Sequence, residues 1–242
     1  MVTTPAVLAL FDEKDPPDVL ARSYFFVPAP NRGGGTGRTR VGGVFLHQPT
    51  VAILLPSDFP PLSRRRPGFA DLRHVLVRFS FMLDRLPSRH AYRSATLVIA
   101  LDHPAAIVRA QRPTRVTADA ESTDSVTTEF SAALDGLARI GAERTKVKTA
   151  TYRTGRLPVI TAENRGQNGF GWHYEAQEGA PLLPRIEFTL AVIELPREAT
   201  ELSGRLVCEA VVDAPRLGIL TTARAAPAEP PVPFRLPLGL AA

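Results

Sequence analysis

Residues 73–101, RHVLVRFSFMLDRLPSRHAYRSATLVIAL, decide the fold of this chain. On both sides of a turn-rich centre at 85–93, strongly apolar side chains alternate with polar or smaller ones. Successive side chains of a strand point to opposite faces of a sheet, so each half offers one apolar face to a core. The stretch therefore predicts two strands, Arg73–Asp84 and Ser94–Asp102, which form a half-buried antiparallel pair at the centre of a sheet.

Similar runs recur along the chain between clusters of Pro, Gly, Asn and Asp. Residues 157–162 and 170–176 predict a hairpin, because the Asn168-Gly169 pair between them suits a tight turn. Residues 185–195 and 204–212 predict a further long pair of strands.

These runs indicate one fold class for the whole chain. Many strands of this spacing are typical of an antiparallel β-sandwich of jelly-roll or immunoglobulin-like type. We therefore expect a mainly β protein in which residues 1–242 form a single sandwich domain. Flexible loops are expected at 29–43 and 57–70, and a proline-rich, polyproline-like tail at 225–242.

The composition favours a globular protein of a reducing compartment. Hydrophobic residues make up 44% of the chain, enough for a sizeable core. No apolar run approaches the ~20 residues of a membrane-spanning helix. The single cysteine, Cys208, cannot form an internal disulfide, and the first residues lack the basic start and long apolar stretch of a secretory signal. We therefore expect a cytoplasmic protein.

The net charge of +5 has a compositional explanation. Only three of the 29 basic residues are lysines, and the chain holds 23 prolines, a bias typical of a GC-rich bacterial genome. The triplet Arg64-Arg65-Arg66 has no aromatic residues interleaved with it, so it predicts a solvated loop. Nucleic acid is therefore not an expected partner.

One stretch has the period of a helix. Residues 124–140 carry an apolar stripe along one helical face and predict an amphipathic helix. The stripe consists of Val126, Phe130, Ala133, Leu134, Leu137 and Ile140. Residues 144–156 follow as a cationic strand in which lysines alternate with threonines and valine.

Together, residues 122–156 suggest a membrane-acting alternative. An amphipathic helix with an adjoining cationic strand can bind an anionic membrane surface, or insert as a hairpin after assembly. The residues that would contact the anionic surface are Arg144, Lys146, Lys148, Arg153 and Arg156. The other interpretation is a helix packed on the sheet with a solvated basic strand beside it.

A glycine-rich basic stretch, NRGGGTGRTRVGG, spans residues 31–43. It lacks the Lys-Ser or Lys-Thr that closes a phosphate loop, so a flexible hairpin loop is the favoured interpretation. The alternative is a phosphate-binding loop in which Arg32, Arg38 and Arg40 grip the anion.

The strongest acid–base candidates lie close together near residue 173. His173 and Glu175 share one strand face, while the neighbouring Phe170, Trp172 and Tyr174 share the other. This spacing permits a hydrolase or carbohydrate-binding site. The simpler interpretation is an aromatic strip facing the core, with His173 and Glu175 in solvent.

No catalytic, cofactor-binding or metal-binding motif is found. The five histidines are spread singly, and there is no cysteine pair. We therefore expect a non-catalytic binding or assembly protein without a cofactor, which contacts a protein partner or its own copies through sheet edges and loops. The membrane-acting effector and the hydrolase or carbohydrate-binding protein remain the alternatives.

Overall fold

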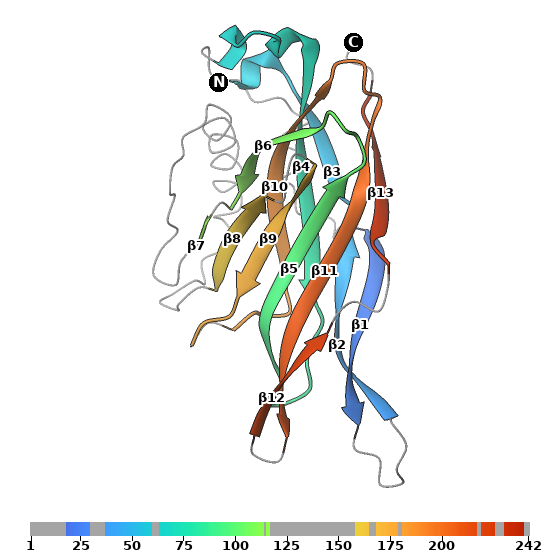
Figure 1. Cartoon of the computed structure of the whole chain (residues 1–242), viewed down its shortest axis with the longest axis vertical. Coiled ribbons are helices and arrows are strands. Elements are labelled where there is room, and N and C mark those ends of the chain that lie inside the picture. Colours follow the sequence, from blue (N-terminus) through green and yellow to red (C-terminus); the bar gives the residue numbers. More distant parts are fainter. Residues whose placement is uncertain are drawn as a thin grey trace.

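The computed structural model describes residues 18–29, 37–59, 63–113, 115–116, 158–164, 168–178, 181–216, 219–225 and 230–239. They form two antiparallel sheets packed face to face, with strands that run along the length of an elongated molecule (Figure 1). The antiparallel β-sandwich expected from the sequence is confirmed.

The first sheet has the order β1-β2-β4-β10-β6, with β3 pairing β4. Both β2 and β3 pair with β4, one after the other along its length, because the chain bends at His47–Pro49 between them. Its strands are β1 (Val19–Ala29), β2 (Gly37–His47), β3 (Thr50–Leu54), β4 (Leu72–Leu83), β6 (Ile107–Arg112) and β10 (Ile186–Pro196).

The second sheet has the order β12-β11-β5-β9-β8-β7, with β13 pairing β11. In Figure 1 it is the front layer, and β8 and β7 form its left-hand edge. Its strands are β5 (Ala91–Leu101), β7 (Arg115–Val116), β8 (Val159–Asn164), β9 (Gly169–Glu175), β11 (Glu201–Arg216), β12 (Ile219–Ala225) and β13 (Val232–Pro237).

The main core lies between the two sheets. It takes the inward faces that alternation predicted, including Phe79 and Phe81 of β4, Leu97 and Ile99 of β5, and the fully buried Trp172 of β9. Aromatic rings interlock there edge to face, with the Phe79 and Phe170 centroids 5.7 Å apart. Burial of these large side chains is the main stabilising contribution to the sandwich.

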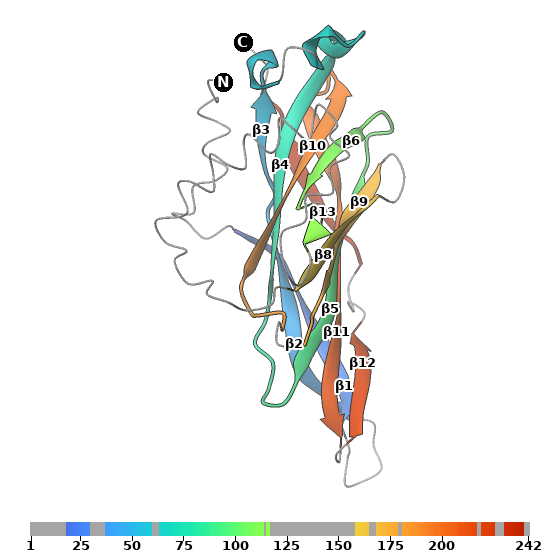
Figure 2. The same cartoon turned by 90° about the vertical axis from the view of Figure 1, so that its left-hand side faces the viewer.

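A second, smaller core covers the outer face of the first sheet. The chain between β3 and β4 forms three short 3-10 turns, η1 (Pro56–Asp58), η2 (Ser63–Arg65) and η3 (Phe69–Asp71). Figure 2 shows these turns at one end of the molecule, opposite the end at which β11 and β12 meet. Phe59 and Phe69 pack there with residues on the outward faces of β3, β4, β6 and β10.

Three details of the predicted organisation are corrected. Residues 37–43 belong to β2 and not to a flexible loop, because they pair with β1. The described part of 57–70 is anchored by the buried Phe59 and Phe69. The tail is strand β13 over Val232–Pro237, since its alternation buries Phe234 and Leu236 in the main core.

The predicted pairing of the two strands in residues 73–101 is also wrong. β4 pairs with β2, β3 and β10 in the first sheet, whereas β5 pairs with β11 and β9 in the second. The connection at 84–90 passes from one sheet to the other. The two long runs thus face each other across the core instead of lying side by side.

The expected helix at 124–140 lies outside the described residues. In the described part of the chain, no helix has the length and apolarity needed to span a bilayer.

Candidate functional site

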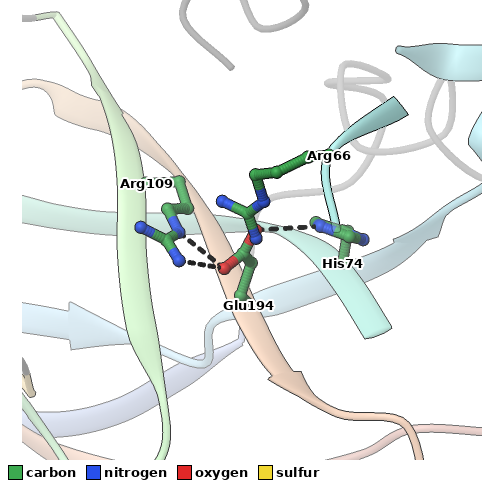
Figure 3. A network of polar contacts seen from close by, with 4 residues as sticks. All are labelled: Arg66, His74, Arg109 and Glu194. Carbon is green, nitrogen blue, oxygen red and sulfur yellow. Dashed lines mark hydrogen bonds and ion pairs between the residues drawn. The ribbon is translucent and has the colours of Figure 1, made fainter. Parts of the chain in front are cut away.

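The most concentrated cluster of charge in the described residues surrounds Glu194 of β10 (Figure 3). Only 1% of its side chain is exposed. Arg66 Nη2 donates to Glu194 Oε1 at 2.5 Å, and Nε and Nη2 of Arg109 both lie 2.5 Å from Oε2. The fourth partner is His74, whose ring Nε2 lies 3.1 Å from Oε1.

Four separate elements bring these side chains together. Antiparallel register sets Glu194 of β10 directly opposite His74 of β4. The pairing of β10 with β6 shifts between Ala110 and Val108, so Arg109 is an extra residue in β6 that reaches across to Glu194. Arg66 comes from the chain between η2 and η3.

The phenyl rings of the outer core hold His74 in place. Its ring stacks on Phe69 with centroids 4.4 Å apart and meets Phe59 edge to face at 4.9 Å. Burial alone would raise the pKa of Glu194, but hydrogen bonds from His74, Arg66 and Arg109 outweigh it and lower that pKa to about 2. Glu194 is therefore ionised at neutral pH, so His74 must carry a proton on Nε2 to donate to it.

This cluster (Arg66, His74, Arg109 and Glu194) can act as a latch. The Glu194 carboxylate accepts three hydrogen bonds and makes a further ion-pair contact with Arg109 Nη2. It has little capacity left to accept a proton from a substrate, so it does not suit the role of a general base. Its bonds instead join the chain between β3 and β4 to the outer face of β4, β6 and β10. Ala70, in the same connection between β3 and β4, accepts a hydrogen bond through its carbonyl from the guanidinium of Arg197, which follows β10, at 3.2 Å. This bond strengthens the attachment.

The predicted acid–base pair on β9 occupies the outer face of the second sheet. His173 Nδ1 lies 2.9 Å from Thr96 Oγ1 on β5, and Glu175 is exposed near the end of the strand. Phe170, Trp172 and Tyr174 face the core, as the aromatic strip required. Among the described contacts, none links His173 to Glu175.

The arginines of the glycine-rich stretch are placed only in part. Arg38 and Arg40 lie in β2, and Arg32 lies outside the described residues. The Arg40 guanidinium donates to Asp84 at 2.6 Å and sits 3.7 Å from the Tyr24 ring centroid. Arg40 is thus already paired within the sandwich.

The cationic residues of the membrane-acting alternative lie outside the described residues. They are Arg144, Lys146, Lys148, Arg153 and Arg156. What the structure gives is the position of the two ends of their segment, residues 117–157. It leaves the sandwich after β7 and returns at β8, and these two strands pair with each other.

The latch was not found by sequence reasoning, although one signal was present. Glu194 lies within TLAVIELP, where it is the only charged residue. A lone carboxylate in a strand that is apolar on both faces predicts a buried charge with a cationic partner. Which cations would reach it depends on a turn and on two other strands, so the partners could not be read from the sequence.

Comparisons with known proteins give no family for this chain. No family model matches it. No curated protein matches it either.

Two solved structures of pore-forming proteins are similar over most of the chain. One is the Clostridium perfringens NetB toxin in its membrane-inserted form, with a TM-score of 0.34, 7% identity, and coverage of 90% of this chain and 96% of that one. The other is described as a pore forming protein, with a TM-score of 0.32, 6% identity, and 89% of each chain covered. TM-scores and identities this low carry no argument for a shared family or activity.

Proposed function

We propose that this protein is a non-catalytic, self-associating β-sandwich protein that acts on anionic membrane surfaces through residues 122–156. The observation that carries the proposal is the antiparallel pairing of β7 with β8 at the edge of the second sheet. Arg115 pairs with Thr161 and Val116 with Ile160, so the segment 117–157 begins and ends at neighbouring positions.

This topology supports movement of the segment without unfolding of the sandwich. Every other strand of the second sheet, from β12 to β8, is paired independently of the segment. A connection whose two ends lie side by side can change its conformation while the strands that hold those ends keep their partners. The apolar stripe and the cationic strand of 122–156 then supply the two interactions that bind a protein to an anionic lipid surface.

The same edge is where we place self-association. β7 spans only Arg115–Val116 and is the outermost strand of the second sheet, so β7 and β8 form a short edge there. An edge of this kind can accept a strand from a second copy.

Other sheet edges oppose such pairing. β1 has two shifts of register and carries the exposed Arg22. β13 carries Pro233 and Pro237, which have no N–H to donate, on either side of the exposed Arg235. Association by edge pairing is therefore proposed at the β7–β8 edge and not at these strands.

Co-sedimentation with lipid vesicles tests the proposal. The protein is mixed at low salt with vesicles of phosphatidylcholine alone or of phosphatidylcholine with phosphatidylserine, and release of a trapped dye separates surface binding from permeabilisation. Binding is expected only to the anionic vesicles. It should weaken at high salt, because salt screens exposed charges.

Charge reversal at Lys146 and Lys148 identifies the segment responsible. We expect K146E/K148E to lose vesicle binding. The matched control R65E/R235E makes the same change of charge at exposed positions of η2 and β13, and it should bind as the wild type does. Equal loss in both variants, or no binding by the wild type at low salt, contradicts the membrane-acting proposal.

Light scattering tests self-association separately. A discrete oligomer or a longer assembly, in solution or on vesicles, supports it, and a monomer under all these conditions contradicts it.

The cytoplasmic location and the absence of catalysis remain proposals from the sequence. Cell fractionation checks the first, and hydrolase assays on H173A and E175Q, which should not differ from the wild type, check the second.

A further inference from the structure

A second polar contact network joins the two sheets at the point where the segment 117–157 leaves. Gln111 lies opposite Ala191 of β10, a residue of the main core, so its side chain points inward from the first sheet. Its Nε2 donates to the Gly171 carbonyl of β9 at 3.0 Å, and the Glu163 carbonyl of β8 lies 3.5 Å away. One amide thus contacts two strands of the opposite sheet.

Trp172 provides the second half of this network. Its ring is fully buried between the sheets, and its Nε1 donates to the Pro113 carbonyl at 2.9 Å. Pro113 lies where the chain crosses from β6 in the first sheet to β7 in the second. The bond therefore holds the crossover against the core.

Close packing of the backbone around Gly171 fixes the position of β9 in this network. A Cβ at position 171 would collide with the Leu97 carbonyl oxygen of β5, so β9 lies unusually close to β5 at this point. Because β9 is held in this way, the carbonyl that Gln111 contacts has a fixed position.

We infer that Gln111 and Trp172 are positioning residues that brace the two sheets together at the root of the segment 117–157. A polar amide inside a sandwich is unfavourable unless it is hydrogen-bonded, so its place here reflects the carbonyls that it reaches. The brace spans the β6–β7 crossover on one side of the root and β8 and β9 on the other. The brace keeps this edge of the sandwich closed when the segment changes its conformation. That role rests on the proposed function, whereas the contacts of the brace do not.

Hydrogen exchange followed by mass spectrometry tests the brace without any membrane. Gln111→Met keeps the length of the side chain and removes its donors. We expect peptides from β6–β7 and from β8–β9 to lose protection by about tenfold, the effect of one buried hydrogen bond. Peptides from β4, β10 and β11 should keep theirs. The matched control is Gln48→Met, since the Gln48 amide also lies near a carbonyl of another strand, that of Arg235 at 3.5 Å.

The outcomes separate a brace from general stability. Local loss of protection in Q111M, absent in Q48M, supports the inference. A uniform loss over all strands would show only a weaker fold, and an unchanged pattern would show that the amide holds nothing; either result overturns it.

Emission from Trp172, the only tryptophan, gives a second measurement. In Q111M its maximum should shift to the red as the edge admits water, and an unshifted maximum would count against the brace. Failure of the wild type to bind vesicles would refute the proposed function and leave both of these measurements intact.

Discussion

Glu194 and His74 face each other across β10 and β4, and the His74 Nε2 lies 3.1 Å from the Glu194 Oε1 with almost no solvent at either side chain. This contact belongs to the outer face of the first sheet, not to the main core. It joins the strands to Arg66, a residue of the chain that crosses over them. The outer core is thus held by charge as well as by apolar packing.

Removal of the Glu194 charge is expected to destabilise the fold. In Glu194→Gln the guanidinium groups of Arg66 and Arg109 lose their anion, and loss of one partner from a buried ion pair costs about 3–5 kcal/mol. Since Arg66 and Arg109 are 30% and 31% exposed, water compensates part of that loss. We expect a decrease of roughly 2–4 kcal/mol in the free energy of unfolding, measured in urea.

Glu198→Gln is the matched control for this variant. Glu198 is an exposed glutamate in the turn that follows β10, so its change should lie within about 0.5 kcal/mol of the wild type. If E194Q were as stable as E198Q, the latch would not hold the outer core.

The contribution of the Glu194 carboxylate should also appear in the pH dependence of the free energy of unfolding. The pKa of Glu194 lies at about 2 in the folded protein, below its ordinary value of 4.5. The unfolded chain therefore binds this proton first as the pH falls. The stabilisation is complete above pH 4.5 and is lost progressively towards pH 2.

Urea unfolding from pH 6 to pH 2.5 measures this contribution. The difference in stability between the wild type and E194Q should narrow as the pH falls through that window. A difference that stays constant would mean that Glu194 does not titrate as its contacts require.

The face that each strand buries could be predicted from the sequence, but not its partner. Alternation identified Phe79, Phe81, Leu97 and Ile99 as core residues, and all four are buried. It could not reveal that β4 and β5 lie in different sheets. A period of two is the same whether the next strand pairs alongside or crosses to the facing sheet, and the connection at 84–90 is long enough for either.

The long-range polar partners could not be predicted from the sequence for the same reason. Glu194 lies 120 positions from His74 and 128 from Arg66 in the chain. Its contact with His74 depends on strand register, and its contact with Arg109 depends on the shift in β6. In β13, Phe234 and Leu236 alternate with Pro233, Arg235 and Pro237, and the prolines concealed the period of a strand. An edge strand tolerates proline, so composition alone was misleading there.

Neutralisation of Glu187 is expected to stabilise the protein at neutral pH. Glu187 on β10 is 17% exposed, and burial raises its pKa although Arg185 donates to it at 2.5 Å. A raised pKa means that the folded state binds this proton more tightly than the unfolded chain does. The contribution to stability is therefore complete below pH 4.5 and is lost as the pH rises through the folded pKa.

Glu187→Gln mimics the protonated form over the whole pH range. We expect E187Q to be more stable than the wild type at pH 7 and to show no advantage near pH 4, as measured by thermal unfolding. Glu201→Gln, at an exposed position of β11, is the control and should be neutral. Destabilisation of E187Q at pH 7 would mean that the bond to Arg185 outweighs the effect of burial.

Acidification should weaken the corner between β2 and β3 through His47. This histidine is 3% exposed, and its buried Nδ1 has no hydrogen-bond partner within the part of the chain that the structure describes. Burial lowers its pKa below the ordinary 6.5, and a hydrogen bond with the Ser80 backbone offsets part of the change. The unfolded chain thus takes up this proton before the folded protein does, so stability is complete above pH 6.5 and falls below it.

His47→Gln removes this titration and is measured against the wild type by urea unfolding at pH 7.5 and pH 5.5. The wild type should lose more stability between the two values than H47Q, because only the wild type must keep a buried imidazole neutral. His90→Gln, in the turn before β5, serves as the control and should keep the pH dependence of the wild type. An equal loss of stability in the wild type and H47Q would assign the pH dependence to other groups.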